Sequence, residues 1–154
     1  MKRKKWTTTK LIAAGSLGVL SLILSLIGAP ITILSGVPGG SGVINALLGA
    51  TITVLTAMVI QNFGGITISY LVFGLLALPL PILGTPGFLP KVLGSLFSGL
   101  ISDITYSFTK THKKLAAIMV GVVSQLSVGI GIFILGKLFN VPGIEKLDKF
   151  SSIK

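Results

Sequence analysis

The chain has 154 residues, of which 51% are hydrophobic and 10% are charged, and its mean hydropathy is +0.98. Because a soluble domain carries about 25% charged residues, this composition predicts an integral membrane protein. The formal net charge is +10, but the lysines lie at the ends of apolar runs, where membrane topology requires them, so no nucleic-acid partner is expected. The absence of cysteine excludes disulfides, thiol nucleophiles and thiolate metal sites.

Five apolar runs are long enough to cross the ~30 Å hydrocarbon core of a bilayer, which takes about 20 residues of helix. They cover residues 11–34, 43–60, 66–83, 91–108 and 115–139. Backbone groups in lipid must be satisfied within their own segment, so each run is predicted to be a helix. The connecting segments are rich in Gly and Pro, and none resembles an interdomain linker. We therefore expect one domain over residues 1–154, an all-α bundle of five transmembrane helices.

The basic residues predict the orientation of this bundle. Five of them precede or open the first run, and three more lie in the segment 109–114, four crossings later. Both segments are expected on the cytoplasmic side, so the N-terminus is cytoplasmic and the uncharged segments 35–42 and 84–90 lie outside. A cleaved signal peptide is the alternative for the N-terminus, but no suitable cleavage site follows the first run. The tail 140–154 is expected outside, either as the end of a five-helix protein or as a loop leading to a sixth helix.

The first run carries a stripe of small side chains, spaced alternately four and three residues apart. Its members are Ala14, Gly18, Ser21, Ser25 and Gly28. Small residues let helices approach each other closely in a membrane. The stripe therefore predicts either packing within this chain or a docking face for a helix of another subunit.

The fourth run contains an aspartate, Asp103, within an apolar segment. At 3.6 residues per turn, the small and polar residues of this run share one face. They are Lys91, Gly94, Ser95, Ser98, Gly99, Ser102, Asp103 and Tyr106. A charge in lipid costs at least ~2.5 kcal/mol, so Asp103 is expected to point into the bundle. It is interpreted as a structural buried carboxylate, with a proton or cation site on a transport path as the alternative. The structural interpretation is preferred because no other acidic residue lies within a run.

The groups that an enzyme of the membrane would need are missing from the sequence. The single histidine, His112, lies among lysines, and no cluster of acidic residues is available to hold a metal. No set of Ser, His and Asp suggests a nucleophile. The segment GVPGGSG lacks the Gly-Lys-Ser/Thr ending of a phosphate-binding loop. We expect neither enzymatic activity nor a metal or cofactor.

Residues 86–121, PGFLPKVLGSLFSGLISDITYSFTKTHKKLAAIMVG, resemble the S-components of energy-coupling factor (ECF) transporters. These small membrane proteins capture vitamins, vitamin precursors or related micronutrients. Their fourth helix often ends near G-x-x-S-D, which Gly99, Ser102 and Asp103 match here. The family usually has six helices, whereas this sequence has five runs. Its Ala-xxx-Ala element in the first helix is replaced by Ala14-xxx-Gly18.

The resemblance implies a substrate-binding subunit without an ATPase of its own. Its partners would be a transmembrane coupling subunit and two ABC ATPase subunits, and its pocket would lie near the outer helix ends. Residues implied for the pocket are Asn45, Lys91, Ser95 and Gln125. Residues implied for contact with the coupling subunit are Ala14, Gly18 and Ser21.

Each pocket residue has an alternative role in ordinary hydrogen bonding between helices, and Lys91 has another in reaching the lipid headgroups. For the whole chain, the alternative is an accessory membrane subunit or a small homo-oligomeric channel that binds no solute. The sequence does not identify the substrate.

Overall fold

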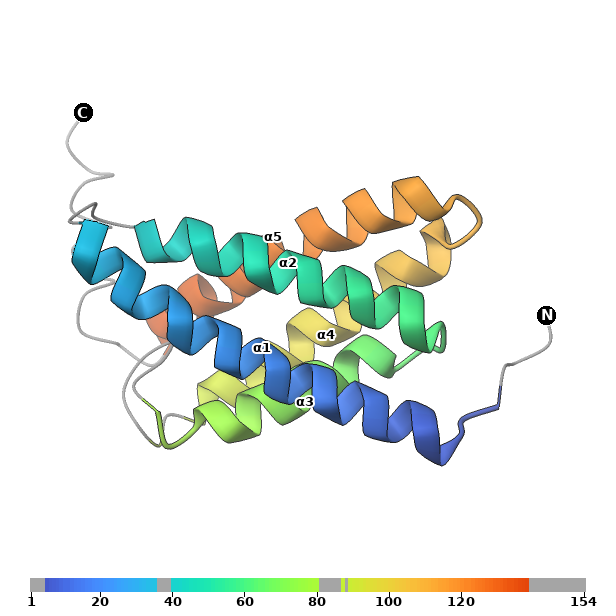
Figure 1. Ribbon diagram of the computed structural model, residues 1–154, viewed down its shortest axis with the longest axis horizontal. Coiled ribbons are helices and arrows are strands. Elements are labelled where there is room, and N and C mark those ends of the chain that lie inside the picture. Colours follow the sequence, from blue (N-terminus) through green and yellow to red (C-terminus); the bar gives the residue numbers. More distant parts are fainter. Residues whose placement is uncertain (1–4, 36–39, 81–86, 88, 139–154) are drawn as a thin grey trace.

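The computed structural model describes residues 5–35, 40–80, 87 and 89–138, which form five α-helices and no strand (Figure 1). In chain order they are α1 (Thr8–Ser35), α2 (Gly40–Ile60), α3 (Gly65–Ala77), α4 (Pro90–Thr109) and α5 (Lys113–Leu138). The predicted all-α class with five helices is confirmed for this part of the chain. The tail 140–154, on which the question of a sixth helix depends, lies outside the described residues.

The third helix is shorter than the run that predicted it. The apolar run extends from residue 66 to 83, whereas α3 ends at Ala77. Pro79 has no amide hydrogen and therefore cannot donate to the helical ladder. The chain accordingly tightens into turns in which Leu78 N donates to Leu75 O and Leu80 N donates to Ala77 O. The apolar run thus extends past the end of α3, because Pro79 ends the helix while the apolar residues continue.

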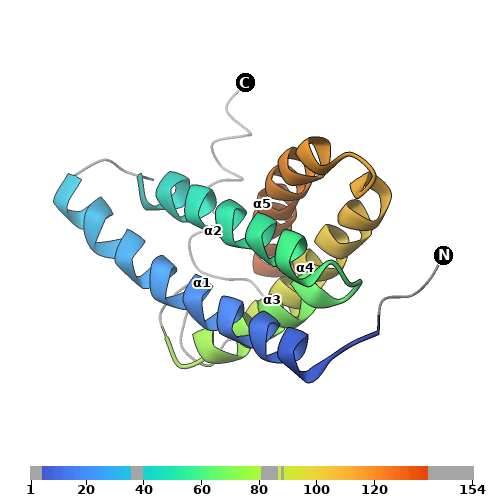
Figure 2. The ribbon, with the colours of Figure 1, turned by 45° about the vertical axis from the view of Figure 1, so that its right-hand side comes forward.

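The helices form a closed ring of neighbours. α1 packs against α2 and α3, α3 packs against α4, α4 against α5, and α5 against α2 (Figures 1 and 2). The N-terminus of α1, the α2–α3 connection and the α4–α5 turn lie at the same end of the bundle. We call this the basic end, because Lys5, Lys10, Lys110, Lys113 and Lys114 belong to these segments.

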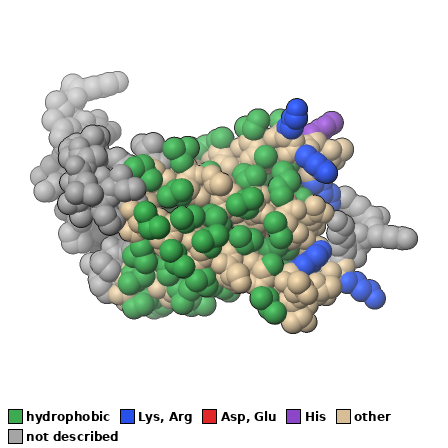
Figure 3. Space-filling model, viewed as in Figure 1, with side chains coloured by type: hydrophobic (Ala, Val, Ile, Leu, Met, Phe, Trp, Pro, Cys, Tyr) green, Lys and Arg blue, Asp and Glu red, His purple; other side chains and the backbone are tan. Residues whose placement is uncertain are grey.

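The interior of the ring is unusually polar. Among the described residues, eleven polar or charged side chains are buried, against nine apolar ones. More than half of the large apolar side chains are instead exposed, and each of the five helices carries some of them. Figure 3 shows apolar side chains across the middle of one face, with the lysines gathered at one end.

Two helices contain a stretch that is long and apolar enough to cross a membrane. These stretches are Thr8–Ile27 in α1 and Lys113–Gly131 in α5. The stretches Ile44–Ile60 and Gly65–Ala77 are also apolar but shorter.

Candidate functional site

Asp103 is held by the first turn of α3. The residue is 1% exposed, and both carboxylate oxygens accept hydrogen bonds from the facing helix. Oδ1 accepts from the backbone N–H of Ile66 at 3.3 Å. Oδ2 accepts from the backbone N–H of Thr67 at 2.8 Å and from its hydroxyl at 2.5 Å. The carboxylate therefore serves as the N-terminal cap of a helix other than its own.

The sequence around residue 64 explains why α3 needs this cap from outside. The N-cap residue is Gly64, which has no side chain to accept a hydrogen bond and adopts a φ of 91°, a conformation that favours glycine. The first amide groups of a helix have no acceptor within the helix. A negative charge there also interacts favourably with the helix dipole. Asp103 supplies both the missing acceptor and the charge.

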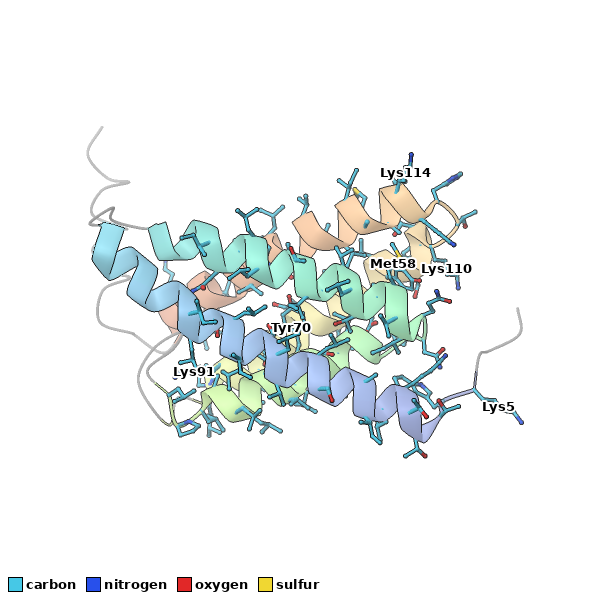
Figure 4. All side chains as sticks on the ribbon, in the orientation of Figure 1. Lys5, Met58, Tyr70, Lys91, Lys110 and Lys114 are labelled. Atoms are coloured by element: carbon cyan, nitrogen blue, oxygen red, sulfur yellow. The ribbon has the colours of Figure 1, made fainter. Side chains whose placement is uncertain are left out.

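Lys91 has the complementary position at the other end of α3. Its side chain is 6% exposed, and Nζ donates to the carbonyl oxygen of Leu80 at 2.7 Å and to that of Ala77 at 3.5 Å. Carbonyl groups at a helix C-terminus lack donors within the helix and carry partial negative charge. The ammonium group is therefore satisfied by the backbone that follows α3. Figure 4 shows Lys91 far from Lys110 and Lys114 along the bundle.

The spacing of these two charges on α4 matches the length of α3. Lys91 and Asp103 are twelve residues apart, which corresponds to about 18 Å at ~1.5 Å per residue. α3 has 13 residues and therefore the same length between its first and last residues. The two helices approach closely, because a Cβ at Gly99 would lie 2.7 Å from Thr67 Cα, and one at Gly74 would overlap Ser95 Oγ. One antiparallel helix thus caps both ends of its neighbour.

A second group of polar side chains joins α2, α3 and α5 at mid-bundle. The Tyr70 hydroxyl is hydrogen-bonded to Thr53 Oγ1 at 3.0 Å and lies near the Ser124 side chain. Thr53 Oγ1 donates in turn to the carbonyl oxygen of Gly49. Gln125 Nε2 is 3.4 Å from Ser124 Oγ, which makes this a long hydrogen bond. Figure 4 shows Tyr70 in the middle of the bundle.

Asn45 Oδ1 and Ser98 Oγ are the buried side-chain atoms of the described residues that have no hydrogen-bond partner. Leaving such an atom unpaired costs roughly 1–3 kcal/mol, so a bound molecule that pairs with it gains affinity. Asn45 lies one helical turn before Gly49, and a Cβ at Gly49 would be 3.0 Å from Gln125 Nε2. Gly49 of α2 therefore lies against Gln125 of α5 near mid-bundle, and Asn45 lies on the same face of α2, one turn farther from the basic end.

The four predicted pocket residues do not form a single cluster. Asn45 and Gln125 share the α2–α5 interface, whereas Lys91 and Ser95 lie between α4 and α3. Ser95 Oγ donates to the carbonyl oxygen of Val92 in its own helix, next to Gly74 of α3. Lys91 binds the backbone after α3. The α2–α5 pair carries the unpartnered acceptor and is the better candidate for binding a solute.

Two of the three residues predicted to contact a coupling subunit pack within the chain. The carbonyl oxygen of Ala14 accepts a hydrogen bond of 2.6 Å from Ser69 Oγ of α3. A Cβ at Gly18 would lie 2.5 Å from the Ser69 carbonyl oxygen. These contacts correspond to the alternative of packing within the chain. Ser21, on the same stripe, is half-buried. A Cβ at Gly15 would meet no atom within 4 Å, so the neighbouring face of α1 that carries Gly15 is open.

Sequence reasoning missed Tyr70, Thr53 and Ser124, the three side chains that meet at mid-bundle. A tyrosine and a threonine in separate apolar runs have no local pattern that brings them together. Their only signal is that a hydroxyl in lipid needs a partner. It missed Thr67 as well, although a threonine three residues after Gly64 lies at the N3 position, where capping interactions converge. No group of three or more His, Cys, Asp or Glu side chains that could hold a metal ion occurs among the described residues.

No family model matches the sequence, and no curated protein or solved structure matches the chain at a significant level.

Proposed function

We propose that the chain is a multi-pass membrane subunit that captures a small solute. Specifically, we propose the role of an S-component in an ECF-type importer for a vitamin, a vitamin precursor or a similar micronutrient. The membrane location rests on the distribution of side chains between the interior and the surface. The solute-binding role rests on the unpartnered acceptor of Asn45 in the α2–α5 interface.

The main support for the membrane location is that polar side chains lie inside the bundle and large apolar side chains lie on its surface. A soluble protein buries its large apolar side chains and rarely exposes wide apolar patches. Here Ile12, Ile118 and Phe97 are more than 60% exposed, while Ser98, Ser102 and Ser124 are fully buried. In lipid, polar groups must find partners inside the protein, and small residues mediate the contact between helices. This arrangement supports the proposed membrane location.

The lysines support a cytoplasmic position for the basic end. Lys5 and Lys10 at the start of α1, with the three lysines around the α4–α5 turn, lie on one side of the apolar band. The cytoplasmic side of membrane proteins carries such an excess of basic residues. Lys91 at the other end is compatible with this orientation, since its ammonium group is buried and bonded to carbonyl oxygens.

The proposed solute site lies between α2 and α5. Asn45 supplies an acceptor without a partner, and Gln125 supplies an amide nitrogen that makes only a long hydrogen bond of 3.4 Å to Ser124 Oγ. Ligand sites between helices combine apolar walls with a few such polar groups. Lys91 is retained in this proposal as a structural cation, and Ser95 as a packing residue beside Gly74. Asn45 and Gln125 are the residues that we assign to solute binding.

Solute uptake by this mechanism requires partners, and we propose a transmembrane coupling subunit with ABC ATPase subunits. Because Ala14 and Gly18 pack on α3, the face of α1 that carries Gly15 is the surface left for such a subunit. The exposed apolar residues Val19 and Ile23 extend it along the helix. The neighbouring small and apolar residues suit contact between helices in lipid.

The test is mass spectrometry of small molecules released from the detergent-purified protein. A stoichiometric micronutrient-like compound is expected, and Asn45→Leu should lose it, because leucine keeps the volume and removes the acceptor. Thr51→Val is the matched control on α2, since Thr51 is exposed and its hydroxyl bonds only to Leu47 O. A protein that carries no solute and does not co-purify with an ATPase module would contradict the proposal. It would favour an accessory subunit or a channel instead.

A further inference from the structure

Three lysines surround the turn between α4 and α5. Lys110 follows the last residue of α4, and its N–H donates to the carbonyl oxygen of Tyr106. Lys113 and Lys114 are the first two residues of α5. All three are exposed, as are Thr111 and His112 between them. Figure 4 shows Lys110 and Lys114 at the same end of the bundle.

No acidic side chain among the described residues neutralises this turn. Asp103 is the acidic residue they include, and its carboxylate is buried and bonded to Ile66 and Thr67 of α3. The lysine turn is therefore a concentrated positive charge at the boundary of the apolar surface. It is complementary to an anion.

Exposed apolar side chains begin immediately beside the lysines. Phe108 is 83% exposed and lies two residues before Lys110, while Leu115 is 50% exposed and directly follows Lys114. Further residues of this kind continue along both helices away from the turn. They are Phe97, Leu100 and Ile104 on α4, and Ile118, Met119 and Val122 on α5. Cationic groups thus stand at the end of a long apolar surface, which is the arrangement that an anionic lipid with acyl chains would match.

We propose that the α4–α5 turn binds an anionic glycerophospholipid of the cytoplasmic leaflet. Lys110, Lys113 and Lys114 contact the headgroup phosphate, and Phe108 and Leu115 contact the upper part of the acyl chains. The inference rests on the proposed membrane location and orientation, and it is independent of which solute is captured. A basic residue near an anionic membrane surface contributes about fivefold in binding, so three of them correspond to roughly 100-fold.

The experiment is native mass spectrometry of the full chain in detergent, titrated with phosphatidylglycerol or with phosphatidylcholine of the same acyl chains. The wild-type protein should retain phosphatidylglycerol at least tenfold more strongly than phosphatidylcholine. K110Q/K113Q/K114Q should lose this preference, and K110R/K113R/K114R should keep it because arginine preserves the charge. Equal thermal melting of the three proteins establishes that the comparison concerns binding and not folding.

Two outcomes would overturn the proposal. One is equal retention of the two lipids by the wild-type protein, and the other is an undiminished preference in the glutamine variant. Neither result bears on solute capture, which is measured separately on released small molecules. Recovery of the chain from the membrane fraction, before any lipid is added, separates failure of the lipid site from failure of the membrane location.

Discussion

Replacing Asp103 by alanine removes the acceptor for three donors at the start of α3. The backbone N–H groups of Ile66 and Thr67 and the Thr67 hydroxyl would lose their partner. No side chain at Gly64 can replace it, because the N-cap position is glycine. Water is a poor substitute, since Asp103 is 1% exposed. The substitution therefore acts on the whole first turn of α3.

The expected loss of stability follows from these contacts. Removing an N-cap costs about 0.5–2 kcal/mol, and each buried donor left without an acceptor costs roughly 1–3 kcal/mol. For Asp103→Ala we expect a loss of about 3–5 kcal/mol, allowing for relaxation of the freed threonine hydroxyl. Asp103→Asn keeps the shape and one acceptor oxygen but loses the charge at the helix N-terminus, which contributes about 0.3–2 kcal/mol. We expect this variant to fold and to lose about 1–2 kcal/mol.

Thermal melting in detergent measures both effects. One kcal/mol shifts the midpoint by roughly 2–4 °C for a chain of this size, so the alanine variant should melt about 10 °C lower than the wild type. Ser107→Ala is the matched control, because it removes a hydroxyl on the same helix that bonds only to the backbone of Asp103. Thr67→Val combined with Asp103→Asn should show a coupling energy, since the two side chains are in direct contact. Unchanged melting of Asp103→Asn together with abolished uptake would refute the capping argument and favour a proton or cation site.

Three further predictions concern packing and the remaining polar groups. Gly18→Leu should destabilise the bundle by about 1–3 kcal/mol, because its Cβ meets the Ser69 carbonyl oxygen. Gly15→Leu should melt no lower than the wild type, yet it should reduce uptake by the assembled transporter. Equal melting of the two variants would contradict the α1–α3 contact. Lys91→Met should lower the stability measured by thermal melting by about 1–2 kcal/mol, since the ammonium group bonds to backbone carbonyls. Solute retention should not change. Loss of the solute would instead place Lys91 in the pocket. Tyr70→Phe should lose about 1 kcal/mol in the same assay, and an unchanged midpoint would exclude a stabilising role for its hydroxyl.

The helices were predictable because their signal is local. Apolar runs of sufficient length gave their number and order, and a period of 3.6 residues put Asp103 on the polar face of its helix. The partners of Asp103 were not predictable. They depend on the antiparallel packing of α3 and α4, and on close approaches at Gly74 and Gly99 that no local pattern reveals.

The candidate site was predictable only in part, for a related physical reason. Asn45 and Gln125 were recognised as polar groups in apolar runs, but their common interface is a property of the α2–α5 pairing. Lys91 was proposed as a polar group that could line a pocket or reach the headgroups, while the third helix was expected to continue to residue 83. The chain leaves the helix after Ala77, so carbonyl groups become available to its ammonium group. The position at which α3 ends thus determines the role of Lys91 on α4.

The shortness of α3 gives a common reason for both charges of α4. A helix of 13 residues spans about 18 Å, well below the ~30 Å thickness of the hydrocarbon core. In the proposed location its ends cannot both reach water, so their unpaired N–H and C=O groups must be satisfied inside the protein. Asp103 supplies an anionic acceptor at the N-terminal end, and Lys91 a cationic donor at the C-terminal end. A charge that would be costly in lipid is stabilised here because each end of the short helix carries the opposite partial charge.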